Sequence, residues 1–283
     1  MSHKGLENLD AREKGYFQFW VTLVQNVRQY KFFLKQLIRV NILVGFKKSF
    51  IGILWLFILP IIAVLIWGLL HGAGIIAPGE TDIPYPAYVL LSTSIWGFFI
   101  EIYRSVSKVI ASNGKIMIMK KFPHEVLVLE LVIVHLILFI IPLIVNVVAL
   151  LFFGIKFTWL SLLFPLTLIP LLLLGISIGL FVSLLRVVAV DISSVIDEMM
   201  RFLMYLTPIV YAPKVSLGWL SDFVEYNPLT YLIGFSREIL TTGTIFEPMK
   251  YAVCSFFCVV FFLLSLRFFL RAESRLLERL ISN

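Results

Sequence analysis

Charged side chains are scarce in this sequence of 283 residues: Asp, Glu, Lys and Arg make up 14% of it, against 60% hydrophobic residues. A soluble domain has about 25% charged and about 45–50% apolar residues. So few charges cannot keep so much apolar surface in water, which excludes soluble enzymes, nucleic-acid-binding domains and disordered chains. The composition predicts an all-α, polytopic membrane protein.

Residues that carry chemistry are also few. Cys254 and Cys258 lie in one apolar run, where we expect two small buried side chains. Asp191 and Asp197 are not spaced as the acidic pair of a metal-dependent transferase. The segment Gly45–Ser49 resembles the end of a phosphate-binding loop but lacks the glycine before its final lysine. The sequence therefore predicts no metal, no cofactor and no ATPase activity on this chain.

Long apolar runs are what the sequence has in abundance. A helix needs about 20 residues to cross a bilayer. The prolines Pro165 and Pro170 should break the first third of the fourth run, and the fifth run needs residues 192–201 to complete a span. We predict a transmembrane domain over 50–270 with six helices, in the runs Phe50–Leu70, Ile83–Ile100, Leu131–Ile155, Phe157–Leu185, Phe202–Pro213 and Tyr251–Leu266.

Basic residues are distributed unevenly among the predicted loops. Twenty of the 24 Lys and Arg fall on the side of both termini. Because basic loops stay in the cytoplasm, we predict a multi-pass protein of the cytoplasmic (inner) membrane with both termini cytoplasmic. The basic excess then reflects topology and the lipid bilayer, with no nucleic acid as a partner. The charged residues Glu101, Arg104 and Glu130 lie near span ends, which argues against ion-coupled transport.

The segment 1–49 precedes the first span and is amphipathic. Over residues 16–41, apolar residues recur on one helical face and a basic stripe on another. We predict a cytoplasmic helix lying in the membrane interface; an ordinary soluble helix is the alternative. The basic stripe consists of Arg28, Lys31, Lys35 and Arg39.

Two further segments lie outside the spans. Residues 112–125 predict a short cytoplasmic helix with apolar and basic faces, which suits docking onto another protein; a solvated connector is the alternative. Residues 212–249 are too apolar for an open loop, so we predict short re-entrant or interfacial helices with a break at Asn227–Pro228. Residues 271–283 form a basic cytoplasmic tail.

Four motifs follow one another along the chain: Phe46–Trp55 with Pro60, Asn113 with Lys120–Val126, Thr207–Tyr211, and Asn227–Tyr231 with Arg237. Together they resemble the membrane subunit of ABC-2-type polysaccharide exporters, the permeases for O-antigen, capsular polysaccharide or teichoic acid precursors. The family often has an Arg-Asp pair after span four, whereas Val190 precedes Asp191 here and Arg186 is the basic residue available.

The resemblance implies a homodimer of this chain with two ATPase subunits, which would hold the ATP and Mg. It also implies that the ATPase docks on a coupling helix, with Asn113, Lys115, Lys120, Phe122 and Pro123 as the contact residues. It further implies an outer gate segment, with Tyr226, Asn227, Pro228 and Tyr231. Because sugars stack on aromatic rings, we expect aromatic side chains along the substrate path; by residue type and span position the candidates are Trp55, Trp96, Phe98, Phe99, Tyr103, Tyr205 and Tyr211.

The function expected from this resemblance is ATP-driven export of a lipid-linked polysaccharide. Two alternatives remain: an ABC-2 exporter of a drug or small lipid, and a membrane enzyme acting on polyprenyl-linked sugars. The enzyme would need an acidic metal-binding set that the sequence does not present. Gly175 and Gly179 form a small-xxx-small pair that favours close helix packing, within the chain or at a dimer interface.

Overall fold

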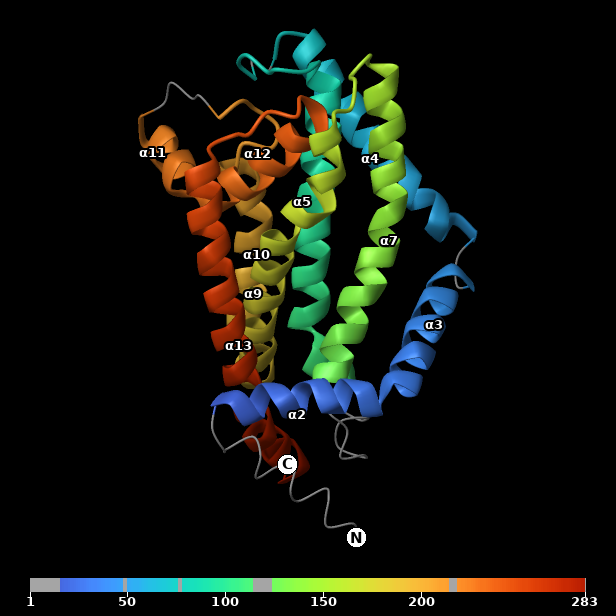
Figure 1. Cartoon of the computed structure of the whole chain (residues 1–283), viewed down its shortest axis with the longest axis vertical. Helices are drawn as coiled ribbons and strands as arrows, with labels where there is room; N and C mark the ends of the chain where they lie inside the picture. Colours follow the sequence, from blue (N-terminus) through green and yellow to red (C-terminus); the bar gives the residue numbers. More distant parts are fainter. Residues whose placement is uncertain (1–15, 48–49, 76–77, 114–123, 214–217, 283) are drawn as a thin grey trace.

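The computed structural model describes residues 16–47, 50–75, 78–113, 124–213 and 218–282, and none of these lies in a β-strand. The all-α class is therefore confirmed for the described residues. The long axis of the molecule is followed by the helices α4 (Phe50–Gly72), α5 (Tyr85–Ser107), α7 (His124–Phe152), α9 (Ile169–Val188), α10 (Val190–Leu206) and α13 (Pro248–Ser282) (Figure 1).

Apolar length distinguishes some of these helices from the rest. Among the described residues, three helical segments are long and apolar enough to cross a membrane: His124–Phe152, Trp159–Val188 and Pro248–Ala272. α10 carries four charged residues in 17, which lowers its mean hydropathy. The protein is thus a membrane protein by helix length and composition.

α5 is the central helix and packs against α4, α7 and α9. Its contact with α9 is close because Gly175 and Gly179 face α5. A Cβ atom added to Gly179 would lie 2.8 Å from the Cβ of Val106, and one added to Gly175 would lie 3.2 Å from the carbonyl oxygen of Phe99. The small-xxx-small pair therefore packs within the chain.

The fourth apolar run is divided as its prolines predict. A 3₁₀-helix, η1 (Trp159–Leu163), is followed by the single turn α8 (Phe164–Thr167) and then by α9. Pro165 and Pro170 each lie in the first turn of a helical segment, where proline's missing N–H costs no hydrogen bond. The predicted break is confirmed.

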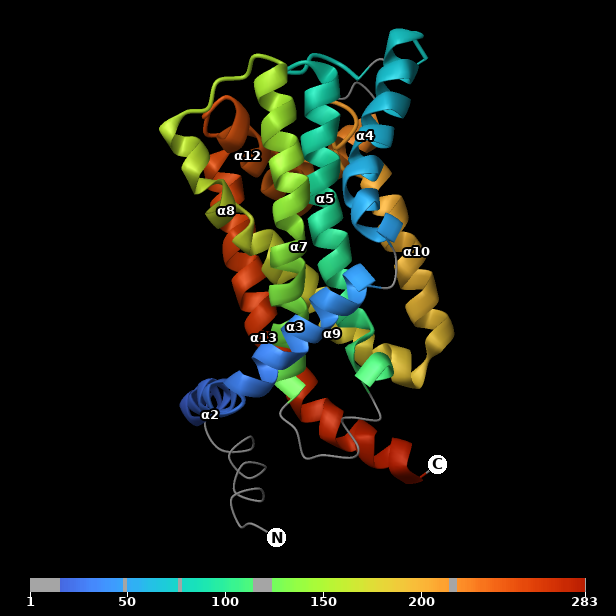
Figure 2. The same cartoon turned by 90° about the vertical axis from the view of Figure 1, so that its right-hand side faces the viewer.

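The N-terminal amphipathic segment bends where we predicted one helix. α2 (Tyr16–Gln29) lies across one end of the bundle and α3 (Lys31–Lys47) leads away from it along α7 (Figures 1 and 2), with a turn at Tyr30. Asn26 and Asn41 would be about 22 Å apart along a straight helix, at 1.5 Å per residue. Their side chains donate hydrogen bonds to Glu125 and Glu130 of α7, which are about 7.5 Å apart by the same rule. The segment therefore has to turn to bring both asparagines within reach of α7.

The opposite end of the bundle carries two short helices, α11 (Gly218–Tyr226) and α12 (Pro228–Thr241) (Figure 1). The break between them is at Asn227, as predicted. The Asn227 side chain accepts a hydrogen bond from the Leu229 backbone N–H, and Pro228 occupies the first helical position. α2 and the C-terminal end of α13 both lie at the other end of the bundle.

Candidate functional site

Two amide–carboxylate hydrogen bonds attach α2 and α3 to α7. The Asn26 Nδ2 donates to Glu125 Oε1 at 2.7 Å, and the Asn41 Nδ2 donates to Glu130 Oε1 at 2.8 Å. Glu125 and Glu130 are both buried. Hydrogen bonds to a charged acceptor are roughly twice as strong as neutral ones. We call these two bonds the α7 clamp. The sequence offered no signal for it, because its partners are 99 and 89 positions apart.

The predicted basic stripe lies on the outside of this end. Arg28, Lys31, Lys35 and Arg39 are all exposed. On the inner face of the same two helices, polar and apolar side chains such as Asn26 and Leu34 are buried. α2 and α3 therefore present cations outward while they pack on the bundle.

The predicted coupling segment joins α5 to α7. Asn113 closes a helical turn that follows α5, and its Nδ2 donates to the Val109 carbonyl oxygen at 3.1 Å. α7 then begins at His124, which is buried together with Glu125. The other coupling residues predicted from the sequence, Lys115, Lys120, Phe122 and Pro123, lie outside the described residues.

Near the same end, an ion pair connects α9, α10 and α5. Arg186 contacts Asp197 Oδ2 through its NH2 at 2.8 Å and donates from Nε to the Ser107 carbonyl oxygen at 3.1 Å. The Tyr103 hydroxyl donates to Asp197 Oδ1 at 2.7 Å. Arg186 therefore pairs with a carboxylate on α10. Asp191, which follows Val190, is exposed. The partner of Arg186 is therefore Asp197, a pairing that the sequence did not predict.

The far end contains a buried polar network around Arg237. Its NH1 donates to Ser92 Oγ at 3.2 Å, its Nε and NH2 contact Glu238 Oε1 at 3.4 Å, and its guanidinium carbon lies 4.0 Å from the centre of the Tyr88 ring. Arg237 and Tyr88 are each 3% exposed. The Tyr88 hydroxyl donates to the carbonyl oxygen of Tyr211 at 2.8 Å. This network ties α12 to α5 and to the turn after α10.

The outer gate residues predicted from the sequence divide by burial. Asn227 is buried and donates to Thr207 Oγ1 at 2.9 Å, so it connects α12 to the end of α10. Tyr231 is buried, and its hydroxyl donates to the Glu225 carbonyl oxygen at 2.6 Å. Tyr226 is 84% exposed and Pro228 is exposed. Asn227 and Tyr231 hold the two short helices together, while Tyr226 and Pro228 face outward.

The aromatic candidates for a substrate path also divide by burial. Four of them, Trp96, Phe98, Phe99 and Tyr103, are buried in the core around α5. Trp55 on α4 and Tyr205 on α10 are 46% and 54% exposed, and both helices lie on the same side of the bundle in Figure 2. Tyr211 is half-buried. Trp55 and Tyr205 can meet a substrate or a second copy without any unpacking of the chain.

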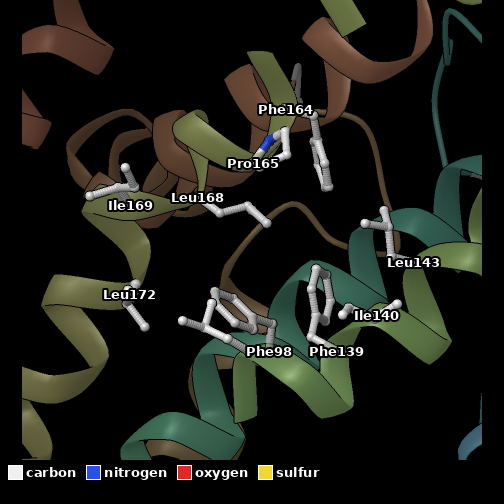
Figure 3. A pocket seen from close by; sticks show the side chains of 10 residues that line it. Phe98, Phe139, Ile140, Leu143, Phe164, Pro165, Leu168, Ile169 and Leu172 are labelled. Carbon is white, nitrogen blue, oxygen red and sulfur yellow. The ribbon is translucent and has the colours of Figure 1, made fainter. Parts of the chain in front are cut away.

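Phe98 lines an apolar cavity of about 240 Å³ between α5, α7 and the α8–α9 junction. Figure 3 shows its ring beside Phe139, with Phe164 and Leu168 across the space; the two Phe ring centroids are 4.6 Å apart. The lining carries no charged side chain. Within the described ranges, no group of three or more His, Cys, Asp or Glu side chains is placed to hold a metal ion.

Comparison with known proteins matches residues 33–241 to the family described as ABC-2 type transporter. The chain is also similar to the O-antigen export system permease protein RfbA of Myxococcus xanthus. The two are 22% identical over 192 residues, which cover 68% of this chain and 72% of that protein. The matched region begins within α3 and ends with α12. It includes the Asn41–Glu130 bond of the α7 clamp, the Arg186–Asp197 pair and the Arg237 network, while Asn26 on α2 precedes it.

Proposed function

Because this chain belongs to the ABC-2 type transporter family, we propose that it is the permease subunit of an ATP-driven exporter that moves a lipid-linked polysaccharide outward across the cytoplasmic membrane. The observation that supports a polysaccharide as the substrate is the similarity to an O-antigen export permease over two thirds of the chain. The scarcity of charged side chains along the predicted spans supports an energy source outside this chain.

The partner in this proposal is a separate ATPase subunit, present in two copies on a homodimer of this chain. ATP and Mg bind to the ATPase. The contact surface on this chain is the cytoplasmic end with α2, α3 and the segment between α5 and α7. Exposed cations at Arg28, Lys31, Lys35 and Arg39 suit anionic headgroups or acidic side chains there.

Force from the ATPase reaches the spans through covalent and hydrogen-bonded connections in this proposal. The segment 114–123 joins the end of the helical residues after α5 to the start of α7, so a push on it acts on both helices. The α7 clamp passes the same displacement to α2 and α3, because Glu125 and Glu130 lie in the first two turns of α7. The Arg186–Asp197 pair passes it to α9 and α10.

The substrate path in this proposal lies between two copies of the chain, along α4 and α10. These helices expose apolar and aromatic residues, including Trp55, Phe202 and Tyr205. Aromatic faces pack against the C–H faces of sugar rings, while the tyrosine hydroxyl bonds to their hydroxyl groups. Two such surfaces facing each other would enclose a path with aromatic side chains from both copies.

A gene deletion tests the proposal. Cells without this chain should accumulate the polysaccharide inside and lose it from the surface, and the wild-type gene should restore export. The tagged chain should co-purify with a nucleotide-binding subunit. Normal surface polysaccharide in the deletion strain would overturn the assignment of the substrate.

The same strain separates the alternatives. An exporter of a drug or small lipid predicts normal surface polysaccharide together with increased drug sensitivity or an altered lipid profile. A membrane enzyme acting on polyprenyl-linked sugars predicts transferase activity in the purified single chain. Each outcome is distinct from intracellular accumulation of a finished polymer.

A further inference from the structure

The end of the bundle opposite α2 has a second cavity, of about 400 Å³, which the substrate path described above does not use. It lies between α11, α12 and the beginning of α13. Its volume is within the usual range of small-molecule sites. Unlike the apolar cavity at Phe98, it mixes aromatic, hydroxyl and charged groups. Its lining consists of Pro213, Ser221, Val224, Glu225, Thr230, Tyr231, Phe246, Glu247 and Lys250.

The strongest sign of a ligand is the hydroxyl group of Thr230. Thr230 is 4% exposed, and its Oγ1 has no hydrogen-bond partner among the described residues. A buried polar atom without a partner destabilises the folded protein, because it has lost its hydrogen bonds to water. Because Thr230 lines the cavity, a ligand there could donate or accept the missing bond.

An aromatic wall faces the same space. The rings of Tyr231 and Phe246 are nearly parallel, with an interplanar angle of 22° and centroids 6.5 Å apart. Phe246 also packs against α12 at Gly234, where an added Cβ would lie 3.0 Å from the ring. Lys250 Nζ lies 5.1 Å from the centre of the Tyr231 ring, and Tyr231 is buried. The half-buried Phe246, held in place by Tyr231 and Gly234, therefore offers most of the apolar surface for the C–H face of a sugar.

Polar contacts hold Tyr231 in position. Its hydroxyl donates to the Glu225 carbonyl oxygen at 2.6 Å and accepts from Lys250 Nζ at 3.2 Å. Lys250 Nζ also lies 3.7 Å from Glu225 Oε1. A binding surface fixed by its neighbours loses little conformational freedom when a ligand binds.

The charges around the cavity restrict the ligand. Glu225 and Glu247 contribute two carboxylates, and Lys250 one ammonium group, so the local balance is negative. Glu247 has φ +44°, a left-handed conformation that is uncommon for a residue with a side chain and that occurs often at binding sites. A negative rim disfavours anionic ligands and tolerates neutral or amine-bearing ones.

We propose that this cavity binds sugar units of the exported chain, and that these units are neutral or carry an amine rather than an acid. The proposal rests on the proposed function and deepens it, since it names the class of sugar. The aromatic wall takes the ring face, the Thr230 hydroxyl and the carboxylates take the sugar hydroxyls, and the rim excludes acidic sugars.

Binding to the full-length chain in lipid nanodiscs tests the proposal. The probes are three trisaccharides: neutral maltotriose, basic chitosan triose and acidic trigalacturonate, with dissociation constants from saturation-transfer NMR. We expect the neutral or the basic probe to bind at least tenfold more tightly than the acidic one. T230V should weaken that binding about five- to tenfold by removal of one hydrogen bond. E247Q removes one carboxylate from the rim, so it should reduce the difference in dissociation constant between the acidic probe and the other two.

The matched control is T241V. Thr241 is on the same helix and buried, but its hydroxyl donates to the Arg237 carbonyl oxygen and does not line the cavity. T241V should bind the probes as the wild type does. Equal binding of all three probes, no binding of any, or unchanged binding by T230V would overturn the proposal.

The deletion strain keeps this test separate from the proposed function. If the deletion strain accumulates polymer inside the cell while T230V binds the probes as the wild type does, the sugar site is excluded and the exporter function stands. If the deletion strain has normal surface polysaccharide while the chain binds the probes selectively and T230V weakens that binding, the exporter function is excluded and the sugar site stands.

Discussion

The two ends of the bundle are held by different kinds of contact. At the end with α2, one hydrogen bond each from Asn26 and Asn41 attaches α2 and α3 to α7. At the far end, Arg237 lies at the centre of a buried network that includes an aromatic ring, a carboxylate and a serine hydroxyl. A single hydrogen bond contributes about 0.5–3 kcal/mol, depending on charge, whereas a buried network is stronger than its separate bonds.

This difference teaches where movement is to be expected. Each hydrogen bond of the α7 clamp can open and close at a smaller cost than a buried network, so the α2 end suits transmission of a displacement. A network that joins α5, α12 and the turn after α10 makes those elements move as one body. The following variants are arranged to break or sharpen that contrast, beginning with the largest effect.

Arg237→Met should lower the free energy of unfolding by about 3–5 kcal/mol, because it leaves the buried Glu238 without its cation. Unfolding in mixed micelles, followed by circular dichroism, measures the change. Arg201→Met is the control, since Arg201 forms an exposed pair with Glu198, and we expect no measurable change. A similar loss in both variants would remove the contrast between a buried network and a surface pair.

Gly179→Ala should cost about 1–3 kcal/mol, because the new methyl group would lie 2.8 Å from Val106 Cβ. Gly97→Ala in α5 is the matched control. Nothing lies within 4 Å of an added Cβ at Gly97, so helix propensity should make that variant neutral or slightly more stable. Equal melting temperatures for the two variants would contradict the close packing of α9 on α5 at Gly179.

Much of the helical architecture follows from the sequence alone. Charge-free runs and prolines are local signals, which is why the break at Asn227–Pro228 and the division at Pro165 and Pro170 were predicted. The turn at Tyr30 was not, because it depends on where Asn26 and Asn41 meet α7.

The candidate site shows the same limit more clearly. Arg186 was identified as the available cation, but its partner proved to be Asp197 on the next helix, which no spacing rule distinguishes from Asp191. The aromatic candidates were chosen by type, and burial then separated Phe99 and Tyr103 from Trp55 and Tyr205. Tertiary packing decides both questions, and a single sequence does not encode it locally.

Asn26→Ala should lower the free energy of unfolding by about 1–2 kcal/mol, and Asn41→Ala by less than about 1 kcal/mol. Asn26 is buried and Asn41 is exposed to solvent, so water can replace the lost bond more easily at Asn41. The same micelle titration measures both. If Asn41→Ala lowers the free energy of unfolding more than Asn26→Ala does, the burial of the asparagine does not determine how much each bond of the α7 clamp contributes to stability.

Tyr205→Ala should change the free energy of unfolding by no more than about 0.5 kcal/mol, since the side chain is exposed. The same variant should reduce polysaccharide export. Tyr205→Phe keeps the ring and should retain most of the export. Surface polysaccharide per cell, corrected for protein amount, gives the readout. Full export by Tyr205→Ala would exclude this side chain from the substrate path.

The most direct test of the central claim is the number of ATP molecules hydrolysed per polymer exported by the Asn26→Ala/Asn41→Ala double variant in proteoliposomes with its ATPase. Gln25→Ala, an exposed neighbour on α2, is the control. If the α7 clamp transmits the displacement, export should fall at least tenfold while ATP turnover stays within about twofold of the wild type. Unchanged export, or export and ATP turnover falling in proportion, would contradict the account.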